Sequence, residues 1–210
     1  MNEKRDKMKA AAHKALALPA SERMKVKPFY TAAGVAPDKE FKKVAGEATG
    51  FVSSIVSSKN WGLDEAKIRF TRERAGSRAY FTLIGGIHCD HKSTGTAVHE
   101  LGHFIENLLP VAQERAHEFR KERIKRSGSK DIPMRDISSA YGASEIGNPD
   151  DWGKAFPADQ AAYVGVTYPT SPDTELISMG FEKLFDDPVG FAQADPEYFK
   201  FIVGIARGEL

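Results

Sequence analysis

Residues 99–103 of this chain read His-Glu-Leu-Gly-His, and this short segment constrains the fold more than any other. It lies in a run, residues 94–109, whose apolar residues have helical spacing. On a helix, positions four apart lie on one face, so His99 and His103 can bind one metal ion. Glu100 then lies beside that ion, where a carboxylate can accept a proton from a metal-bound water. We therefore expect a zinc site on this helix; the alternative is a solvated helix with two unrelated histidines.

The composition is that of an ordinary globular protein, with 41% hydrophobic and 28% charged residues. The 210 residues are enough for one domain with a sizeable core, or for a core with an appendage. Cys89 is the only cysteine, so no intramolecular disulfide is expected. No apolar run reaches the roughly 18 residues of a membrane span, and no apolar segment of a signal peptide follows residues 1–7. We expect a cytoplasmic or particle-associated protein that is not classically secreted and has no membrane partner.

The charge is unevenly distributed, although the net charge is only +1. Residues 1–27 carry eight Lys and Arg against three Asp and Glu, and residues 114–135 carry eight against four. Residues 136–199 carry two against twelve. Solvated faces account for this asymmetry. A nucleic acid is a disfavoured partner, because the total is near neutral and aromatic residues are not interleaved with the basic ones.

The first 60 residues are expected to form an N-terminal helical arm and a first packing helix. Residues 2–18 indicate a helix with a thin apolar face, and residues 19–37 are expected to be irregular. A helix from Asp38 to about residue 57 has a buried apolar stripe. We place the boundary of the second domain at residue 61, so that it covers residues 61–210.

A β-rich segment precedes the motif helix. Residues 67–71 and 79–83 alternate between polar and apolar, with a turn at Gly76, and residues 87–89 indicate a further short strand. We expect a small antiparallel sheet and therefore an α+β fold with a mostly helical C-terminal lobe. This order of elements resembles the N-terminal lobe of the zincin-like metallopeptidases, in which the last strand borders the cleft and can pair with an extended peptide.

The remainder of the chain is expected to be mainly helical. Pro110 ends or kinks the motif helix, and a charged helix continues to about residue 126. Residues 137–170 show little periodicity, and such long stretches often line sites. Ser171 followed by Pro172 predicts the start of a helix that carries Glu175 in its first turn. A last, aromatic-rich helix is expected from Asp195.

A catalytic zinc needs a third protein ligand and one open position. Glu106 and Leu109 stand where the metzincin motif has glycine and histidine, so that class is excluded. Glu175 is favoured, because a carboxylate on a core helix is costly to bury without a cation; an exposed acid stabilised by the helix dipole is the alternative. Glu106 shares the face of the two histidines and is expected to support them or to lie on the surface. The candidates are Glu106, Glu145, Glu175, Glu182, His88 and His91.

Residues 99–103 together with residues 175–181 resemble the gluzincin peptidases, and more narrowly the catalytic domain of anthrax lethal factor and its relatives. The resemblance covers about residues 65–207. It implies that Glu175 is the third zinc ligand and that Tyr168, seven residues earlier, faces the scissile carbonyl. Residues 174–207 also resemble zincin-type domains of bacteriophage proteins associated with head assembly, which implies phage structural proteins as partners and a location in the host cytoplasm or the virion.

The sequence departs from the gluzincin pattern at Met179. Many gluzincins have a second carboxylate four residues after the ligand glutamate, and it supports a ligand histidine. Metal-bound imidazoles normally donate their other N–H group to a neighbour, so Glu106 or Glu182 has to supply this contact. If neither does, weak metal affinity or a degenerate enzyme is expected.

These features together predict a zinc endopeptidase that acts on an extended polypeptide. Glu100 is expected to be the general base, and Tyr168 to stabilise the oxyanion, although a cleft-wall role for Tyr168 is as well supported. His88 is expected at the cleft edge. The alternative is a catalytically weak or inactive zincin-shaped structural or binding module of a phage particle. Further residues that can line the substrate side are Tyr141, Trp152 and Tyr163.

Overall fold

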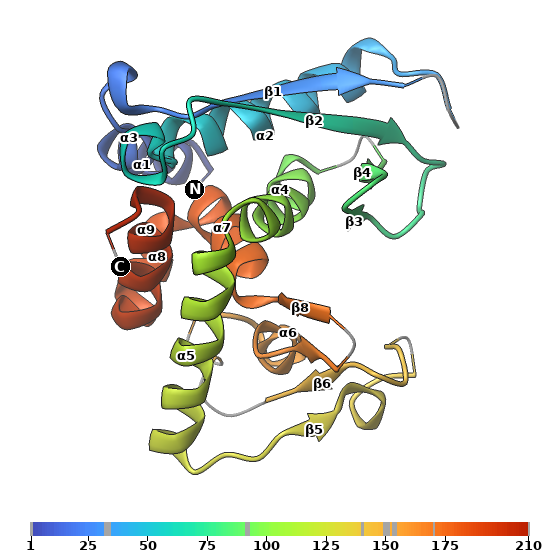
Figure 1. Cartoon of the computed structure of the whole chain (residues 1–210), viewed down its shortest axis with the longest axis vertical. Helices are drawn as coiled ribbons and strands as arrows, with labels where there is room; N and C mark the ends of the chain where they lie inside the picture. The colour runs from blue at the N-terminus through green and yellow to red at the C-terminus, as the bar shows by residue number, and fades with distance from the viewer. Residues whose placement is uncertain are drawn as a thin grey trace.

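The structure is a computed structural model, and it describes residues 2–31, 35–90, 93–139, 141–148, 152, 155–169 and 171–209. His91, one of the candidate ligands, lies outside these residues. The chain has an α+β fold in which two four-stranded sheets lie on opposite sides of a central helical layer (Figure 1). No helix among the described residues combines the length and the apolar character that crossing a membrane requires.

The first sheet is mixed, so the expected antiparallel sheet is wrong for two of its three pairings. Its strand order is β1-β2-β4-β3; β1 pairs parallel with β2, β2 pairs parallel with β4, and only β3 is antiparallel to its neighbour. A parallel pair needs a crossover connection, which helix α2 (Lys39–Ile55) supplies between β1 and β2. The strands are β1 (Lys25–Tyr30), β2 (Glu65–Arg72), β3 (Tyr80–Thr82) and β4 (Gly86–Cys89).

Strand β1 lies in residues 19–37, which were expected to be irregular. Its Pro28 weakens the strand signal, but proline is tolerated on an edge strand, and β1 is at the edge of the sheet. The boundary expected after residue 60 falls between the paired strands β1 and β2. Whether either part folds alone stays a prediction.

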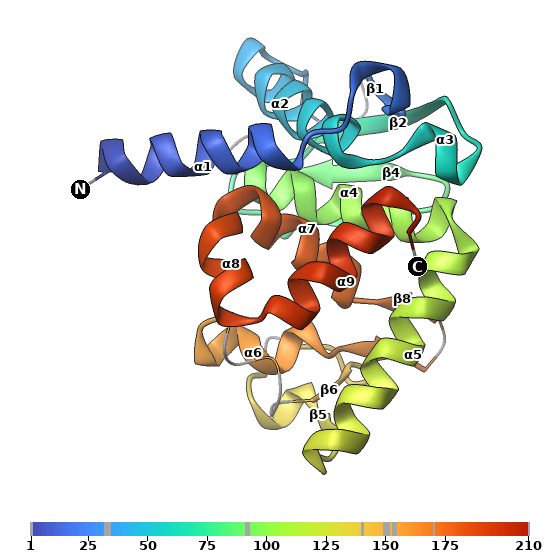
Figure 2. The same ribbon diagram turned by 90° about the vertical axis from the view of Figure 1, so that its left-hand side faces the viewer.

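The helices that the periodicity predicted are present. Helix α2 (Lys39–Ile55) is capped by Asp38, whose side chain accepts a hydrogen bond from the backbone N–H of Phe41 at 2.8 Å. The motif helix α4 (Thr94–Leu108) is followed directly by α5 (Pro110–Ser127), as the proline predicted. Helix α1 (Asn2–Leu16) extends away from the body at its N-terminal end (Figure 2). Shorter elements are α3 (Ser58–Trp61) and the 3-10 turns Ala20–Glu22 and Met134–Asp136.

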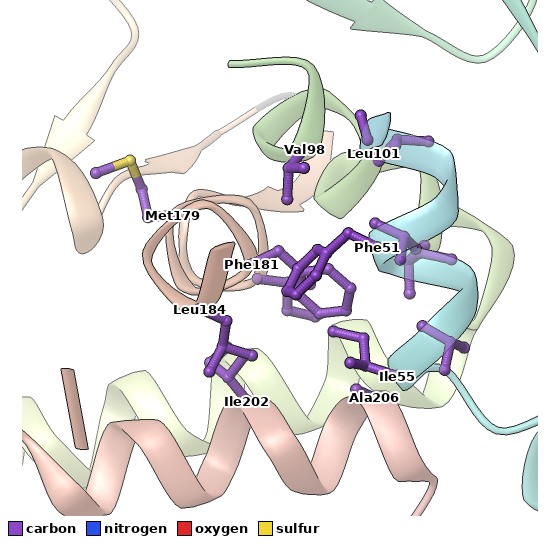
Figure 3. Packing of buried hydrophobic residues seen from close by; sticks show 14 of the residues in the cluster. Phe51, Ile55, Val98, Leu101, Met179, Phe181, Leu184, Ile202 and Ala206 are labelled. Carbon is purple, nitrogen blue, oxygen red and sulfur yellow. The ribbon is translucent and has the colours of Figure 1, made fainter. Parts of the chain in front are cut away.

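The core is formed by α2, α4, α7 (Leu176–Asp186) and α9 (Pro196–Arg207). Figure 3 shows Phe51 of α2 and Val98 of α4 pointing toward Phe181 of α7, whereas Met179 lies on the other side of α7. Helix α8 (Pro188–Ala194) joins α7 to α9. The expected start of α7 is wrong, because the Ser-Pro pair at 171–172 belongs to a strand and the helix begins only after Glu175.

The second sheet is antiparallel and small, with strand order β5-β6-β7-β8. Three of its strands are two residues long, which is too short to produce a periodic pattern, so they could not be predicted from periodicity. Helix α6 (Ala158–Val164) lies beside this sheet (Figure 1). The strands are β5 (Ile132–Pro133), β6 (Ile146–Gly147), β7 (Thr167–Tyr168) and β8 (Ser171–Thr174).

Candidate metal centre

Helices α4 and α7 cross in direct backbone contact at Gly102. A Cβ atom at this position would lie 2.5 Å from Cα of Ser178 and 3.1 Å from the carbonyl oxygen of Ile177. Only glycine allows this approach. The crossing brings the start of α7, and with it Glu175, against the motif face of α4.

His99, His103 and Glu175 converge on one point. The Nε2 atom of His99 lies 3.2 Å from Oε2 of Glu175, and the Nε2 atom of His103 lies 3.3 Å from the same oxygen. One ligand atom from each of the three residues lies within 4.8 Å of the others, which is compatible with a shared metal ion. Glu175 is only 1% exposed. It is therefore a core carboxylate, as predicted, and not an exposed acid at a helix start.

Each imidazole has a carboxylate on its outer side. The Nδ1 atom of His99 lies 3.1 Å from Oε2 of Glu182, and the Nδ1 atom of His103 lies 3.8 Å from Oε2 of Glu106. Glu106 is completely buried and accepts hydrogen bonds from the backbone and hydroxyl groups of Thr174. Both residues named as possible supports occupy that position, one for each histidine. Glu182 is within hydrogen-bonding distance of its histidine, whereas the 3.8 Å between Glu106 and His103 is an ion-pair distance that exceeds a hydrogen bond.

The two carboxylate oxygens of Glu175 have different partners. Oε1 accepts hydrogen bonds from the hydroxyl groups of Tyr163, at 2.7 Å, and Tyr168. Oε2 faces the imidazoles and accepts a hydrogen bond from Oγ of Ser178 at 2.8 Å. Tyr168 is thus brought to the site, but in this structure it binds a candidate ligand.

Sequence reasoning assigned no specific role to Tyr163, which it named only as a possible lining residue. It missed Arg78 entirely, whose Nη2 atom donates to the hydroxyl of Tyr163 at 3.3 Å. These residues come from α6 and from the loop before β3, and no local pattern links those segments. The one available signal was that Tyr163, like Tyr168, lies shortly before Glu175 in the sequence.

The pKa shifts of His99, His103 and Glu175 all favour positive charge on the two imidazoles beside a charged carboxylate. Burial alone lowers the pKa of His99, but its hydrogen bonds to Glu175 and Glu182 outweigh burial and raise the pKa to about 9. The pKa of His103 is likewise raised, because Glu175 and Glu106 outweigh the effect of burial. Burial opposes the charge on Glu175, yet the two histidines hold its pKa well below the usual range. Two imidazole nitrogens and one carboxylate oxygen are a ligand set that suits zinc.

Glu100 lies in the wall of a cavity of about 830 Å³ together with the three candidate ligands. It is 5% exposed, and burial raises the pKa of its carboxyl group. A raised pKa suits a group that has to accept a proton and then release it. Tyr80 and Phe81 of β3 line one side of the cavity, and its other lining residues include Tyr141, Tyr163, Glu145 and Asp173.

Three other candidates lie away from the ligand group. His88 contacts Glu73 at 2.9 Å and stacks on Tyr80, so one ring separates it from the cavity. Glu145 lines the cavity, where its nearest cation is Arg78 at 3.8 Å. Trp152 does not line the cavity; it is fully buried against Tyr198, with ring centroids 5.5 Å apart.

Comparisons of the chain with protein-family models, with curated proteins and with solved structures return no match. What the structure establishes is an α+β fold and a buried group, His99, His103 and Glu175, that can hold a metal ion. The identity of the metal and the reaction are therefore argued from the geometry of this site.

Proposed function

We propose that the protein is a zinc-dependent endopeptidase of the gluzincin type with a zincin-like architecture. The observation that carries the proposal is the buried His99–His103–Glu175 group with Glu100 beside it in the wall of an 830 Å³ cavity. Glu100 is not a member of the ligand group. Catalysis gives a reason for a buried carboxylate at this position, whereas a purely structural metal site does not.

His99, His103 and Glu175 would hold the zinc ion, which supplies Lewis-acid chemistry toward a peptide carbonyl. Glu100 would accept the proton of the attacking water and pass it to the leaving amine. Tyr163 would keep Oε1 of Glu175 occupied, so that only Oε2 is directed at the metal. Tyr168 is the best oxyanion donor, and this role requires its hydroxyl to turn from Glu175 toward the substrate.

The shape of the site supports an extended polypeptide as substrate. The cavity is larger than a single side chain requires, and β3 is an edge strand of the first sheet. Residues of β3 line the cavity, so a peptide in the cavity can add to the exposed edge of that strand. A folded substrate protein would therefore be cleaved only at a segment that can unfold and enter the cavity in an extended conformation.

A catalytically weak or inactive module of a phage particle is the second candidate. It is favoured by Met179, which lines the cavity where many gluzincins carry a carboxylate. Under this proposal the partners are phage structural proteins, and the protein is located in the virion or the host cytoplasm. The outer contacts from Glu182 and Glu106 weaken the argument, because they supply the support that Met179 does not.

The decisive experiment measures metal content and peptide-library cleavage for the wild type and for Glu100→Gln. We expect about one zinc per chain in both proteins and cleavage only by the wild type, because Glu100 binds no metal. A wild type without zinc would end the proposal. Zinc in both proteins with cleavage by neither would establish the structural module instead.

A further inference from the structure

A second, smaller cavity lies beside the first. It has a volume of about 280 Å³ and lies between β2, the turn at residues 83–86 and the C-terminal half of α4. Its apolar walls come from Phe29, Ile68, Phe81, Phe104 and Leu108. We call it the Phe104 groove. Small-molecule sites usually exceed about 300 Å³, so this groove has the size for one or two apolar side chains.

The apolar surface continues outside the groove. Leu83 and Ile84 are 77% and 94% exposed at the tip of the turn, and Phe29 beside them is 48% exposed. Clustered exposed residues of this kind mark interaction sites, whereas isolated ones carry no such meaning.

The turn is held in place without any partner. Nε of Arg69 donates to the carbonyl oxygen of Gly85 at 2.6 Å, and Nη2 of Arg69 donates to that of Ile84. Gly86 has a φ of 77° and lies against the backbone of Arg69. A fixed turn loses little conformational entropy on binding, which makes it a preformed docking element.

The Phe104 groove adjoins the metal cavity. Phe81 lines both cavities, and both are bordered by α4, with the histidines in one wall and Phe104 in the other. Asn107 of the groove donates a hydrogen bond to Asp173 of the metal cavity at 2.8 Å. A polypeptide bound at the metal can therefore continue past Phe81 into the groove.

The charge around the groove selects the occupant. Lys67 lines it, Lys27 is its register partner on β1, and Lys25 lies two residues before Lys27 on the same strand. Glu65 pairs with Lys27, which leaves an excess of positive charge along this face. Acidic residues on either side of an apolar side chain complement such a rim.

We propose that the Phe104 groove binds an apolar side chain, flanked by acidic residues, in a segment of the substrate polypeptide away from the scissile bond. This inference rests on the proposed function, since it takes the occupant to be the substrate. The groove then acts as a specificity site that selects proteins carrying an acidic-apolar segment.

The test uses zinc-loaded Glu100→Gln, which cannot consume the probe. One probe is an acetylated, amidated octapeptide with a Leu-Phe pair flanked by aspartates, and the other has lysines in place of the aspartates. We expect the aspartate peptide to bind about tenfold more tightly, measured by isothermal titration calorimetry. It should shift the amide NMR signals of residues 83–86 and 104–108.

Ile84→Ser and Lys67→Glu should each weaken this binding about tenfold, because both residues line the groove. Both side chains are exposed, so the two variants should keep the fold. Val111→Ser is the matched control, because Val111 is 48% exposed on α5 and does not line the groove. Equal binding of both peptides, or unchanged binding by Ile84→Ser, would overturn the proposal. Two other results would also overturn it. One is a dimer that Ile84→Ser abolishes, because a second copy of the chain would then occupy the groove. The other is binding to phosphatidylserine vesicles that Ile84→Ser abolishes, because a membrane would then be the partner.

The outcome is separable from that of the proposed function. Specific binding of the aspartate peptide to a protein without zinc or cleavage would support the groove as a binding site but overturn the substrate as its occupant. Cleavage by the wild type, with no selective binding in the groove, would refute the groove alone.

Discussion

Glu175 is the residue on which the candidate site depends, because each of its carboxylate oxygens has a separate set of partners. Oε2 faces both imidazoles, and Oε1 is held by Tyr163 and Tyr168. A carboxylate held in this way offers one oxygen to a metal and does not swing to offer two. Both tyrosines therefore belong to the candidate metal site through their hydrogen bonds to Glu175.

Tyr163→Phe should lower zinc affinity about tenfold to a hundredfold, because it removes a hydrogen bond that orients a ligand. Competition with a chelator measures this loss. The cobalt-substituted protein provides a second readout, because its visible absorption spectrum changes when the carboxylate binds through two oxygens. Tyr80→Phe is the control, since Tyr80 lines the same cavity without a contact to Glu175. Unchanged affinity and spectrum in Tyr163→Phe would contradict this role.

Glu182 and Glu106 should differ in what their loss costs. Glu182→Gln should reduce zinc affinity by about tenfold to a hundredfold with little change in metal-free stability, because its side chain is 31% exposed. Glu106→Gln should reduce both, because Glu106 is completely buried and accepts two hydrogen bonds from Thr174. Chelator competition and urea unfolding of the metal-free proteins separate the two effects. Equal stability losses would show that burial does not distinguish these carboxylates.

At the scale of elements, the crossing of α4 and α7 brings the candidate ligands together, and Gly102 permits the crossing. Gly102→Ala should destabilise the metal-free protein by about 1–3 kcal/mol, because the added methyl group forces the helices apart. Gly46→Ala is the matched control, since Gly46 lies in α2 with nothing within 4 Å of its Cβ position. That change should stabilise the protein by up to about 1 kcal/mol through helix propensity. Urea unfolding measures both, and a stabilised Gly102→Ala would refute the close-contact argument.

The elements also show which parts of the fold could be predicted. Helices α2, α4 and α9 have long apolar stripes and clear caps, so their periodicity predicted them. The start of α7 was misplaced because a Ser-Pro pair is typical of a helix N-terminus, yet here it forms strand β8. Parallel pairing of β1 with β2 depends on contacts between distant segments, and no local pattern records such contacts.

The candidate site also contains residues that could be predicted from the sequence and residues that could not. His99, Glu100 and His103 share one helical turn, so a local motif predicted them. Glu175 required an argument from burial together with a family resemblance. Tyr163 and Arg78 could not be predicted, because their contacts exist only once α6 and the loop before β3 are packed against the start of α7.

For the whole molecule, the protons in the metal-free site link stability to pH. The folded-state pKa of His99, about 9, exceeds the value of 6.5 expected in the unfolded chain. The stabilisation from this group is therefore complete below pH 6.5 and is lost as the pH rises toward 9. Zinc requires the deprotonated ring, so it competes with these protons.

The difference in melting temperature between zinc-loaded and metal-free protein should accordingly grow from pH 6.5 to pH 9. Differential scanning fluorimetry across this range measures it. Zinc binding near neutral pH should also release at least one proton, which calorimetry in buffers of different ionisation enthalpy detects. A melting-temperature difference that stays constant or shrinks as the pH rises would contradict the linkage.

The candidate ligands lie on α4 and at the residue that precedes α7, which are far apart in the sequence, and this separation has a kinetic consequence. If zinc binds these residues, its binding is complete only once α4 and α7 have docked, and contacts between segments so far apart in the sequence form slowly. Stopped-flow experiments should therefore show that zinc slows unfolding and leaves the folding rate nearly unchanged. The metal would then prolong the lifetime of the folded protein without accelerating its folding.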